Sequence, residues 1–458
     1  MEQQYTTINR KDNKLLYVLD TGLDKFVIFV IILVRQFVPK RLKGQFDSLC
    51  KHKEMLHNVV GLAFFNALGG LCVMTTQIKL ANYLGASVYG VYAYCLAIGE
   101  VGSVFVRYGR NKTMVRDLIQ YPKKRDALVV STFFLSIINL ILFLIMVFAC
   151  HKPLEIEKSW TYFLLIMTPC LASLTLGPLY ESLSMMSWSS IYAFLQKVVF
   201  LTAIWILFFT QVHVSLLTIG TIVLASWIIV YIVEYHEIIT QLHINFFRKV
   251  DIKDIWNLYK ENFIIFLSCV TGVAFGPLMQ MILNNYADSK SVGIYAAGLQ
   301  IYYICIFFNT QVGRVGNPMM AQACKSNVSL VERRQLVWRY TTIMMLTAIP
   351  FALPMLLCPQ FLTDLIYTAE YESLSKYLPI FSVYLVAISL GVVFTQFLIS
   401  MRKDREYFTI YISSAVATII LAYLLIPKYS VLGAVLSLCV PHSIGCALYF
   451  LFSIKYLK

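Results

Sequence analysis

Ionisable side chains lie inside long apolar stretches of this chain, where each must face water or find a partner. Glu100 and Arg107 lie seven positions apart in one such stretch, with Ser103 between them. In a helix these three residues share one face, which places a carboxylate and a guanidinium about two turns apart. Burying such groups in hydrocarbon costs several kcal/mol unless they line a wet cavity or bind a partner. Proton transfer and the binding of anions are therefore the chemistry to expect.

Lys197 is a further charge within an apolar stretch. It lies about two turns inside, at a depth from which an ammonium group reaches the aqueous boundary with difficulty. Glu181 closes the preceding stretch, and it either pairs with Lys197 or caps the end of its own helix. Glu234 and His236 are interpreted as marking the end of a later stretch.

Amide side chains recur at helical spacing in both halves of the chain. Gln280 and Asn284 lie four positions apart after a glycine stripe, and Pro277 is expected to kink their helix. Corresponding helices of the two halves are thus polar on one face, as expected of helices that line one cavity. The candidate ligand-binding residues are Asn66, Gln77, Glu100, Arg107, Glu181, Lys197, Gln280, Asn284, Asn309, Gln311 and Arg314.

Structural roles are open for the same residues. A glycine stripe also permits close helix packing, and amide side chains also form hydrogen bonds between helices. Arg107 and Arg314 lie near the ends of their stretches, where a guanidinium can extend to the membrane interface.

Known catalytic motifs are missing from the sequence. It contains no Gly-rich phosphate loop, no His-Glu-x-x-His and no Gly-x-Ser-x-Gly. The eleven cysteines include no Cys-x-x-Cys pair and no Cys/His cluster. Neither an enzyme nor a cofactor, metal site or disulfide framework is therefore predicted.

Composition places these residues in a membrane. Apolar residues make up 59% of the 458 residues and charged residues 14%, against about 45–50% and about 25% in soluble domains. The apolar runs are about twenty residues long, which suits helices and is too long for barrel strands. Twelve spans are predicted, near residues 59–79, 88–106, 127–150, 160–181, 190–210, 215–235, 262–284, 294–313, 339–360, 377–401, 408–426 and 433–454.

An internal repeat organises these spans. Leu80–Ile98 recurs 203 positions later as Leu283–Ile301 with eight identical residues, where shared composition would give about one or two. Each copy joins the first two spans of its half, so both halves enter the membrane in the same direction. An all-α integral membrane protein is predicted, with two six-helix lobes as parallel repeats around a central cavity. The lobes are residues 59–235 and 262–458, joined by a cytoplasmic linker at 236–261.

Basic residues predict the orientation. Of the 38 Lys and Arg residues, 31 lie on the side that holds both termini and six on the other, so both termini should be cytoplasmic. This asymmetry on anionic lipid also explains the net charge of +14, and no nucleic-acid partner is expected.

The N-terminal extension, residues 1–58, lies outside the lobes. Its apolar run from Phe26 to Val34 is too short to span a bilayer and is flanked by basic residues. We expect an interfacial helix over residues 25–39. A thirteenth span is the alternative.

Several motifs resemble those of Wzx-type polysaccharide/oligosaccharide flippases, members of the MOP (multidrug/oligosaccharidyl-lipid/polysaccharide) exporter superfamily. The resemblance extends over roughly residues 57–455. It is carried by Leu84-Gly85-Ala-Ser-Val-Tyr89-Gly90-Val-Tyr92, Gly102 to Arg107, Gly177-Pro178-Leu-Tyr-Glu181 and Pro427-Lys-Tyr-Ser-Val-Leu-Gly433-Ala434.

The resemblance implies a function. Such a protein moves oligosaccharide repeat units on undecaprenyl pyrophosphate to the outer leaflet of the bacterial cytoplasmic (inner) membrane, by alternating access, for surface polysaccharide and O-antigen. Lipid-linked oligosaccharide and membrane lipids are the implied partners, with a polysaccharide polymerase and a chain-length regulator. Arg107, Lys197 and Arg314 would belong to a cationic cavity, although few basic residues lie deep in the spans. Coupling to H+ or Na+ stays open, with Glu100 or Glu181 as proton carriers.

Other classes stay open. Residues 102–112 resemble a loop motif of major-facilitator exporters, but Val104 and Val106 stand where that motif has Leu and Asp. A drug or cation antiporter of the MOP superfamily would share the fold and differ in substrate. A membrane glycosyltransferase or polymerase would need a large external loop, and none is predicted. A scaffold without transport activity is the remaining alternative.

Overall fold

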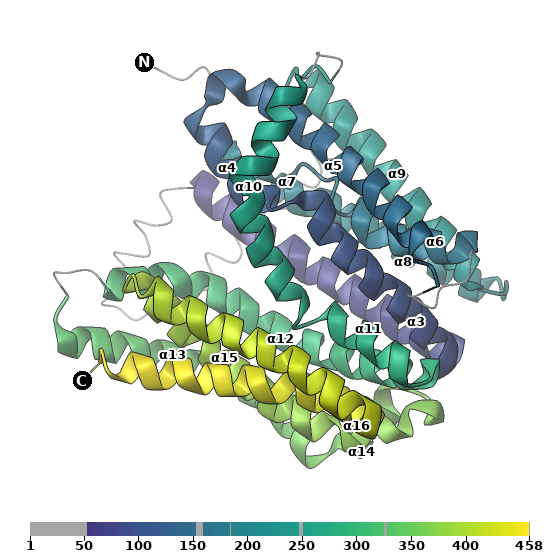
Figure 1. Cartoon of the computed structure of the whole chain (residues 1–458), viewed down its shortest axis with the longest axis vertical. Coiled ribbons are helices and arrows are strands. Elements are labelled where there is room, and N and C mark those ends of the chain that lie inside the picture. The colour runs from purple at the N-terminus through teal and green to yellow at the C-terminus, as the bar shows by residue number, and fades with distance from the viewer. Residues whose placement is uncertain (1–52, 153–158, 184, 247–250, 325–327, 458) are drawn as a thin grey trace. The chain divides into compact units, whose positions relative to one another are not determined.

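The computed structural model describes residues 53–152, 159–183, 185–246, 251–324 and 328–457, which form helices and no strands (Figure 1). The predicted interfacial helix at 25–39 lies outside these residues. The elements are α3 (Lys53–Arg107), α4 (Arg110–Gln120), η2 (Pro122–Lys124), α5 (Arg125–Ala149), α6 (Trp160–Leu171), α7 (Gly177–Ser182), α8 (Met186–Phe209), α9 (Leu216–Thr240), α10 (Ile252–Val273), α11 (Pro277–Tyr286), α12 (Ser289–Ala323), α13 (Leu330–Leu357), α14 (Pro359–Ile366), η3 (Ala369–Lys376), α15 (Leu378–Ser400) and α16 (Asp404–Ile454).

Eight helices within the described ranges are long and apolar enough to cross a membrane, and α10 with α11 makes a ninth if that bent pair is one span. The predicted all-helical membrane class is thereby confirmed. The 50° bend in the pair begins at Pro277, which confirms the predicted kink because proline lacks the N–H that would continue the helix.

Helix boundaries differ from the predicted spans in three places. Helix α16 continues through the predicted spans 408–426 and 433–454, with Ser430 as a non-helical residue. No loop separates the predicted spans 59–79 and 88–106, because α3 continues through them with one non-helical residue, Gly85. The predicted span 160–181 is instead two pieces, since α6 ends at Leu171 and α7 begins only at Gly177. Prolines lie in both pieces and remove backbone donors there.

The described chain forms two compact units. Helix α3 contributes to both units, so their boundaries differ from those of the predicted lobes. The two lobes therefore stay a prediction. The first unit contains the residues up to Val73, Ser103–Met146 and Met167–Phe266. The second unit contains Met74–Gly102, Val147–Ile166 and the residues from Leu267 onward.

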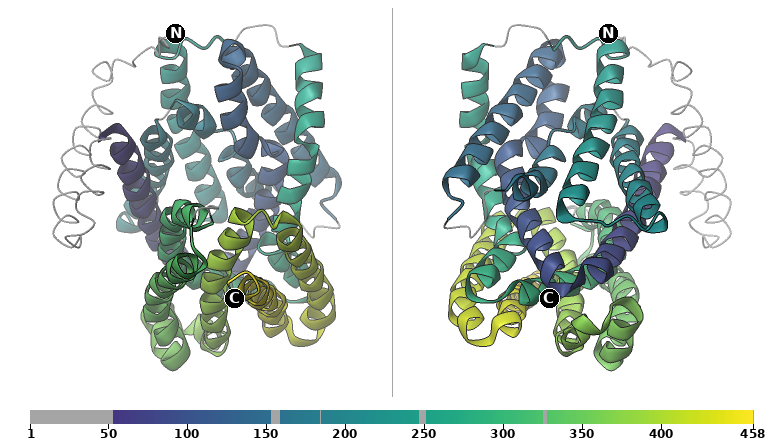
Figure 2. Two further views of the ribbon diagram at one scale, coloured as in Figure 1. Left: turned by 90° about the vertical axis from the view of Figure 1, so that its left-hand side faces the viewer. Right: turned by 90° about the vertical axis from the view of Figure 1, so that its right-hand side faces the viewer.

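The second unit is a bundle centred on α15. Helices α13 and α16 flank α15, and both pack against it (Figure 2). At Ser430 the backbone leaves the helix (φ 48°, ψ −120°), so the two limbs of α16 lie side by side (Figure 1). Tyr340, Phe394 and Phe397 fill the space between these helices.

The first unit has its core where α7, α8 and α9 pack together. Tyr180 of α7, Trp188 and Tyr192 of α8 and Val230 of α9 are nearly or fully buried there. Helix α4 packs against α7 and adds Met114 and Leu118 to this core.

The two copies of the repeat meet within the second unit through equivalent glycines. A Cβ added to Gly90 would lie 1.7 Å from the carbonyl oxygen of Ser289, and one added to Gly293 would lie 2.0 Å from that of Ala86. Both pairs of equivalent positions, Gly90 with Gly293 and Ala86 with Ser289, are 203 residues apart. The contact is therefore reciprocal, and glycine is required on both sides because the backbones touch.

Both copies also interrupt the helix at the equivalent position, but they cap the new helix differently. In the second copy Asp288 precedes α12, and its carboxylate accepts a hydrogen bond from Ser291 N at 3.1 Å. The first copy has Gly85 there, with φ 72° and no side chain. Glu370 of η3 supplies the missing acceptor, since its Oε2 lies 2.7 Å from Ala86 N. A carboxylate distant in sequence thus replaces a local cap.

Further hydrogen bonds hold η3 and the residues before it against α3. The Asn82 side chain donates to Ile366 O at 2.8 Å and accepts from Thr368 N at 3.1 Å. The Tyr371 hydroxyl donates to Ala81 O at 3.1 Å. The break at Gly85 is therefore supported on several sides by one segment.

We expect Gly293→Ala to lower the free energy of unfolding by at least about 1–3 kcal/mol, because the new methyl group would overlap a backbone oxygen. Thermal unfolding of the purified protein in detergent measures this. Gly272→Ala is the control, since its Cβ would lie 3.5 Å from the Tyr411 hydroxyl, an ordinary contact. Equal stability of the two variants would contradict the glycine contact.

Glu370→Ala should destabilise the protein by about 0.5–2 kcal/mol, the usual cost of losing a helix cap. Glu372→Ala removes a carboxylate that is exposed like that of Glu370 but does not bond to Ala86 N, so it should change the unfolding temperature little. A Glu370 variant as stable as the Glu372 variant would show that the Ala86 N–H finds another acceptor.

Candidate functional site

A polar cavity of about 290 Å³ lies inside the first unit, between the end of α3, the first turns of α4, the helix α5 and the α6–α7 connection. Its walls carry cationic, hydroxyl and carboxylate groups. The lining residues are Arg107, Arg110, Asn111, Met114, Thr132, Phe133, Ser136, Ser173, Leu174, Thr175, Leu176, Pro178 and Glu181.

A tight reversal of the chain brings two arginines to this cavity. Helix α3 ends at Arg107, and Tyr108 and Gly109 both adopt positive φ, 45° and 75°. A Cβ at Gly109 would lie 3.0 Å from Ile265 Cγ2, so glycine suits both the dihedral angle and the space. Helix α4 begins at once with Arg110, so both arginines line the cavity.

Arg110 is a buried cation with a buried counter-charge. Its side chain is 2% exposed, and Nη1 lies 2.6 Å from Asp117 Oδ2. It also donates to the hydroxyls of Thr132 and Thr113, at 3.2 and 3.1 Å. Burial lowers the pKa of Arg110, and the hydrogen bond and charge of Asp117 oppose that change. Nη2 has no hydrogen-bond partner in the described part of the chain, so the cation keeps a spare donor.

Arg107 and Glu181 are the predicted site residues that the structure brings together at this cavity. Arg107 is half-buried and donates to Ala172 O at 3.3 Å. Glu181 is exposed. Guanidinium groups beside serine and threonine hydroxyls form an arrangement that suits phosphate or carboxylate oxygens.

Lys197 lies elsewhere in the first unit, against α3. A Cβ added to Gly69 would lie 3.1 Å from Lys197 Nζ, so the ammonium group rests on the helix where glycine leaves room. Asn66, half-buried, is one turn away on α3. The suggested ion pair between Lys197 and Glu181 is not formed by the side chains that the structure describes.

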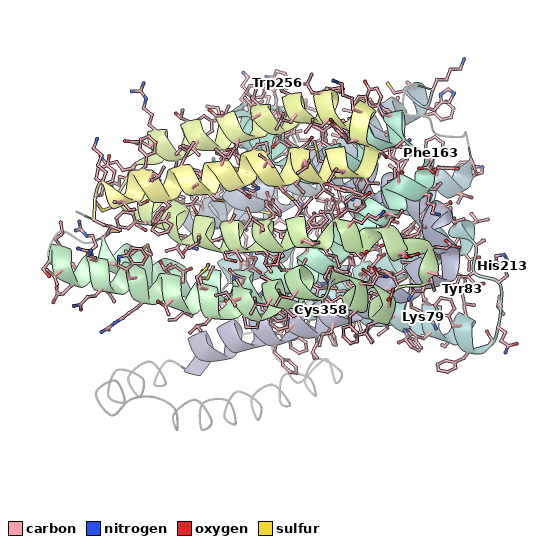
Figure 3. All side chains as sticks on the ribbon, turned by 90° about the horizontal axis from the view of Figure 1, so that it is seen from below. Lys79, Tyr83, Phe163, His213, Trp256 and Cys358 are labelled. Atoms are coloured by element: carbon pink, nitrogen blue, oxygen red, sulfur yellow. The ribbon has the colours of Figure 1, made fainter. Side chains whose placement is uncertain are left out.

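Gln77 lies in the second unit and bonds within it. Its Nε2 donates to the Tyr92 hydroxyl at 3.1 Å, and its Oε1 accepts from the Tyr89 hydroxyl at 3.4 Å. Lys79 and Tyr83 follow on the same stretch of α3 (Figure 3). These bonds match the structural alternative, an amide that bonds between helical segments, here the two parts of α3 on either side of Gly85.

Asn309 is likewise bonded between helices of the second unit. It is 1% exposed and donates to Met344 O at 3.1 Å and to the Thr347 hydroxyl at 3.3 Å. Its packing role between α12 and α13 is therefore visible.

The other candidates lie apart from the cavity. Gln280 and Asn284 on α11 and Gln311 on α12 are half-buried, and Glu100 on α3 is exposed. Arg314 belongs to α12, but its side chain lies outside the described part of the structure.

Sequence reasoning missed the buried charges of the first unit. Glu234, interpreted above as the end of a span, is 1% exposed, and Glu237 is 4% exposed. The pattern of Val223, Ser226 and Val230 on the buried face of α9 continues to both glutamates at helical spacing. Following that period to the end of the helix would have placed them in the core. Arg110 had no such signal, because its burial depends on α4 turning back.

Residues 55–324 match the family described as polysaccharide biosynthesis protein. The chain belongs to this family. No curated protein matches its sequence.

Solved structures show the same fold. A lipid II flippase MurJ in an inward closed conformation has a TM-score of 0.66 at 13% identity over 86% of this chain and 87% of that one. An inward-facing multidrug resistance MATE transporter of the MOP superfamily has a TM-score of 0.59 at 12% identity over 86% and 94%. The predicted resemblance to Wzx-type flippases is confirmed, and the structural likeness shows that this chain has the fold of the MurJ flippase and of the MATE transporter.

Asp117→Ala should lower the free energy of unfolding by about 3–5 kcal/mol, because it leaves the Arg110 guanidinium buried without a counter-charge. Denaturant or thermal unfolding in detergent measures the change. Arg116→Ala removes a 57% exposed partner of the same carboxylate and should cost about 0–1 kcal/mol. Similar losses in the two variants would mean that Arg110 stays hydrated.

Proposed function

We propose that this transporter moves oligosaccharide repeat units, linked to undecaprenyl pyrophosphate, from the cytoplasmic to the outer leaflet of the bacterial inner membrane. The product would be used for surface polysaccharide such as O-antigen. The protein is a membrane transporter with the fold of the MOP superfamily. The cavity with Arg107 and Arg110 is the observation that supports an anionic, lipid-borne substrate.

The physical argument starts from the substrate. A pyrophosphate with attached sugars cannot enter hydrocarbon without losing its hydration. Arg107 and Arg110 offer charge-assisted donors, and Ser136, Ser173 and Thr175 offer hydroxyls on the same walls. The polyprenyl tail needs no such lining, because it remains soluble in lipid throughout the movement.

We further propose twelve crossings in two lobes, residues 59–235 and 262–458, with both termini cytoplasmic. Helices α3 and α16 are each long enough for two crossings, at 44 and 50 residues in their apolar parts, against about twenty for one. The α10–α11 pair and the α6–α7 pair would each form one. The reciprocal contact of Gly90 and Gly293 supports parallel repeats.

Other candidate residues enter as proposals. Lys197, whose side chain lies against Gly69 of α3, would bind the substrate at a second position in the first unit, together with Asn66 one turn away. Gln280, Asn284, Gln311 and Arg314 would serve the second lobe, together with Gln77, Glu100 and Asn309.

Arg107→Ala should reduce transport by about ten- to a hundredfold, as expected for a lost charge-assisted hydrogen bond, with Arg107→Lys less affected. The assay uses proteoliposomes with undecaprenyl pyrophosphate oligosaccharide and an impermeant reagent that modifies exposed glycan. Lys253→Ala, on the exposed first turn of α10, is the matched control. Membrane insertion should be equal in all variants.

Two outcomes would refute the proposal. Wild-type vesicles that translocate no glycan but export organic cations would favour the MATE-like alternative. Glycan movement that is unchanged in Arg107→Ala would remove this cavity from the pathway.

A further inference from the structure

Helix α9 places two carboxylates in the core of the first unit, within a candidate membrane span. Glu234 is 1% exposed and Glu237 is 4% exposed. They lie three residues apart and therefore share one face of the helix. No ion pair reaches either carboxylate from the described side chains. Two negative charges in such a place would be strongly unfavourable, and a proton on one of the carboxylates removes the repulsion between them.

The surroundings of Glu234 leave a position for such a proton. Oε1 accepts a hydrogen bond from Leu176 N at 3.1 Å. Oε2 is buried and has no partner among the described groups. A protonated carboxyl group carries its hydrogen on one oxygen and keeps the other as an acceptor, which agrees with this asymmetry.

Tyrosines from two neighbouring helices complete the cluster. The Tyr192 hydroxyl of α8 donates to Glu237. Tyr180 of α7 is fully buried, its ring centroid lies 5.7 Å from that of Tyr192, and its hydroxyl has no partner among the described residues. The Tyr180 oxygen is close enough to both carboxylates to interact electrostatically with them. An unpartnered buried hydroxyl thus belongs to the same core as the two buried acids.

Two further tyrosines and an arginine near these carboxylates bond elsewhere. Tyr231 and Tyr235 of α9 donate to the carbonyls of Leu171 and Leu174. Arg107 of α3 interacts with Tyr231 and donates to a different carbonyl, that of Ala172. Neither carboxylate therefore receives a cation from these elements.

We propose that Glu234 and Glu237 form a proton-binding site whose occupancy is coupled to substrate binding. In the coupled step, one carboxylate takes one proton from water and becomes a neutral carboxylic acid, and the reverse step returns it. Leu176 links the two sites, because its N–H donates to Glu234 and Leu176 is itself one of the residues that line the cavity. An anion in the cavity would favour the neutral acid, and by reciprocity the proton would favour the bound anion.

This inference rests on the proposed transport of an anionic substrate, but proton binding can be measured without transport. Infrared titration of the full-length protein in detergent should show the carbonyl band of a protonated carboxylic acid near neutral pH. Glu234→Gln should remove part of that band, while its amide oxygen still accepts from Leu176 N. Glu261→Gln replaces an exposed carboxylate and should leave the band unchanged. Tyr180→Phe removes only the unpartnered hydroxyl and should shift the band.

Transport then tests the coupling. Glycan movement into proteoliposomes should respond to an imposed pH gradient in the wild type and lose that response in Glu234→Gln, with the variant still inserted. If wild-type vesicles move no glycan but the infrared band is present, the proposed substrate fails and the proton site stands.

The proton site itself would be overturned by a wild-type protein without the acid band at neutral pH, which needs no variant to fold. A band unaffected by both Glu234→Gln and Glu237→Gln would also overturn it. A pH-gradient response retained in full by Glu234→Gln would overturn the coupling.

Discussion

Where a helix of this protein is interrupted, the backbone groups at the break need hydrogen-bond partners. A buried N–H left without a partner costs about 1–3 kcal/mol, and at two of the breaks a distant segment supplies the acceptor. Glu370 does so for the restart after Gly85, and Glu234 does so for Leu176 before α7. In both places a carboxylate from a distant segment makes an irregular backbone stable.

These two carboxylates differ in what surrounds them, and their roles differ accordingly. Glu370 lies on a short turn between α14 and α15, where its acceptor role explains its position. Glu234 is in a dry core beside Glu237 and two tyrosines, where its second oxygen has no described partner. One carboxylate thus acts as a cap alone, whereas the other is a cap placed where its charge is unfavourable. That difference is why the proposed proton site is assigned to Glu234 and not to Glu370.

The cavity of the first unit depends on the same requirement, that a buried polar group has hydrogen-bonding partners. Arg110 can be buried because Asp117 and two threonine hydroxyls meet its guanidinium. The left-handed turn at Tyr108 and Gly109 also brings Arg107 to the lining of this cavity. A structural ion pair and a second cavity-lining cation are therefore products of one reversal of the chain.

Composition, apolar run length and the repeat predicted a helical membrane protein with duplicated halves, because these properties belong to each segment by itself and need no knowledge of its neighbours in space. The equivalence of Gly90 and Gly293 was also visible as a sequence pattern, and so was the kink at Pro277. Site residues were harder to predict, because the polarity of a side chain does not reveal its partner. Gln77 and Asn309 form hydrogen bonds within the second unit. Arg110, Glu234 and Glu237 are buried in the first unit, and the sequence pattern was not interpreted as predicting this. The burial of Arg110 depends on α4 turning back against other segments, which helical periodicity along one segment does not record, whereas the period of the buried face of α9 continues to both glutamates.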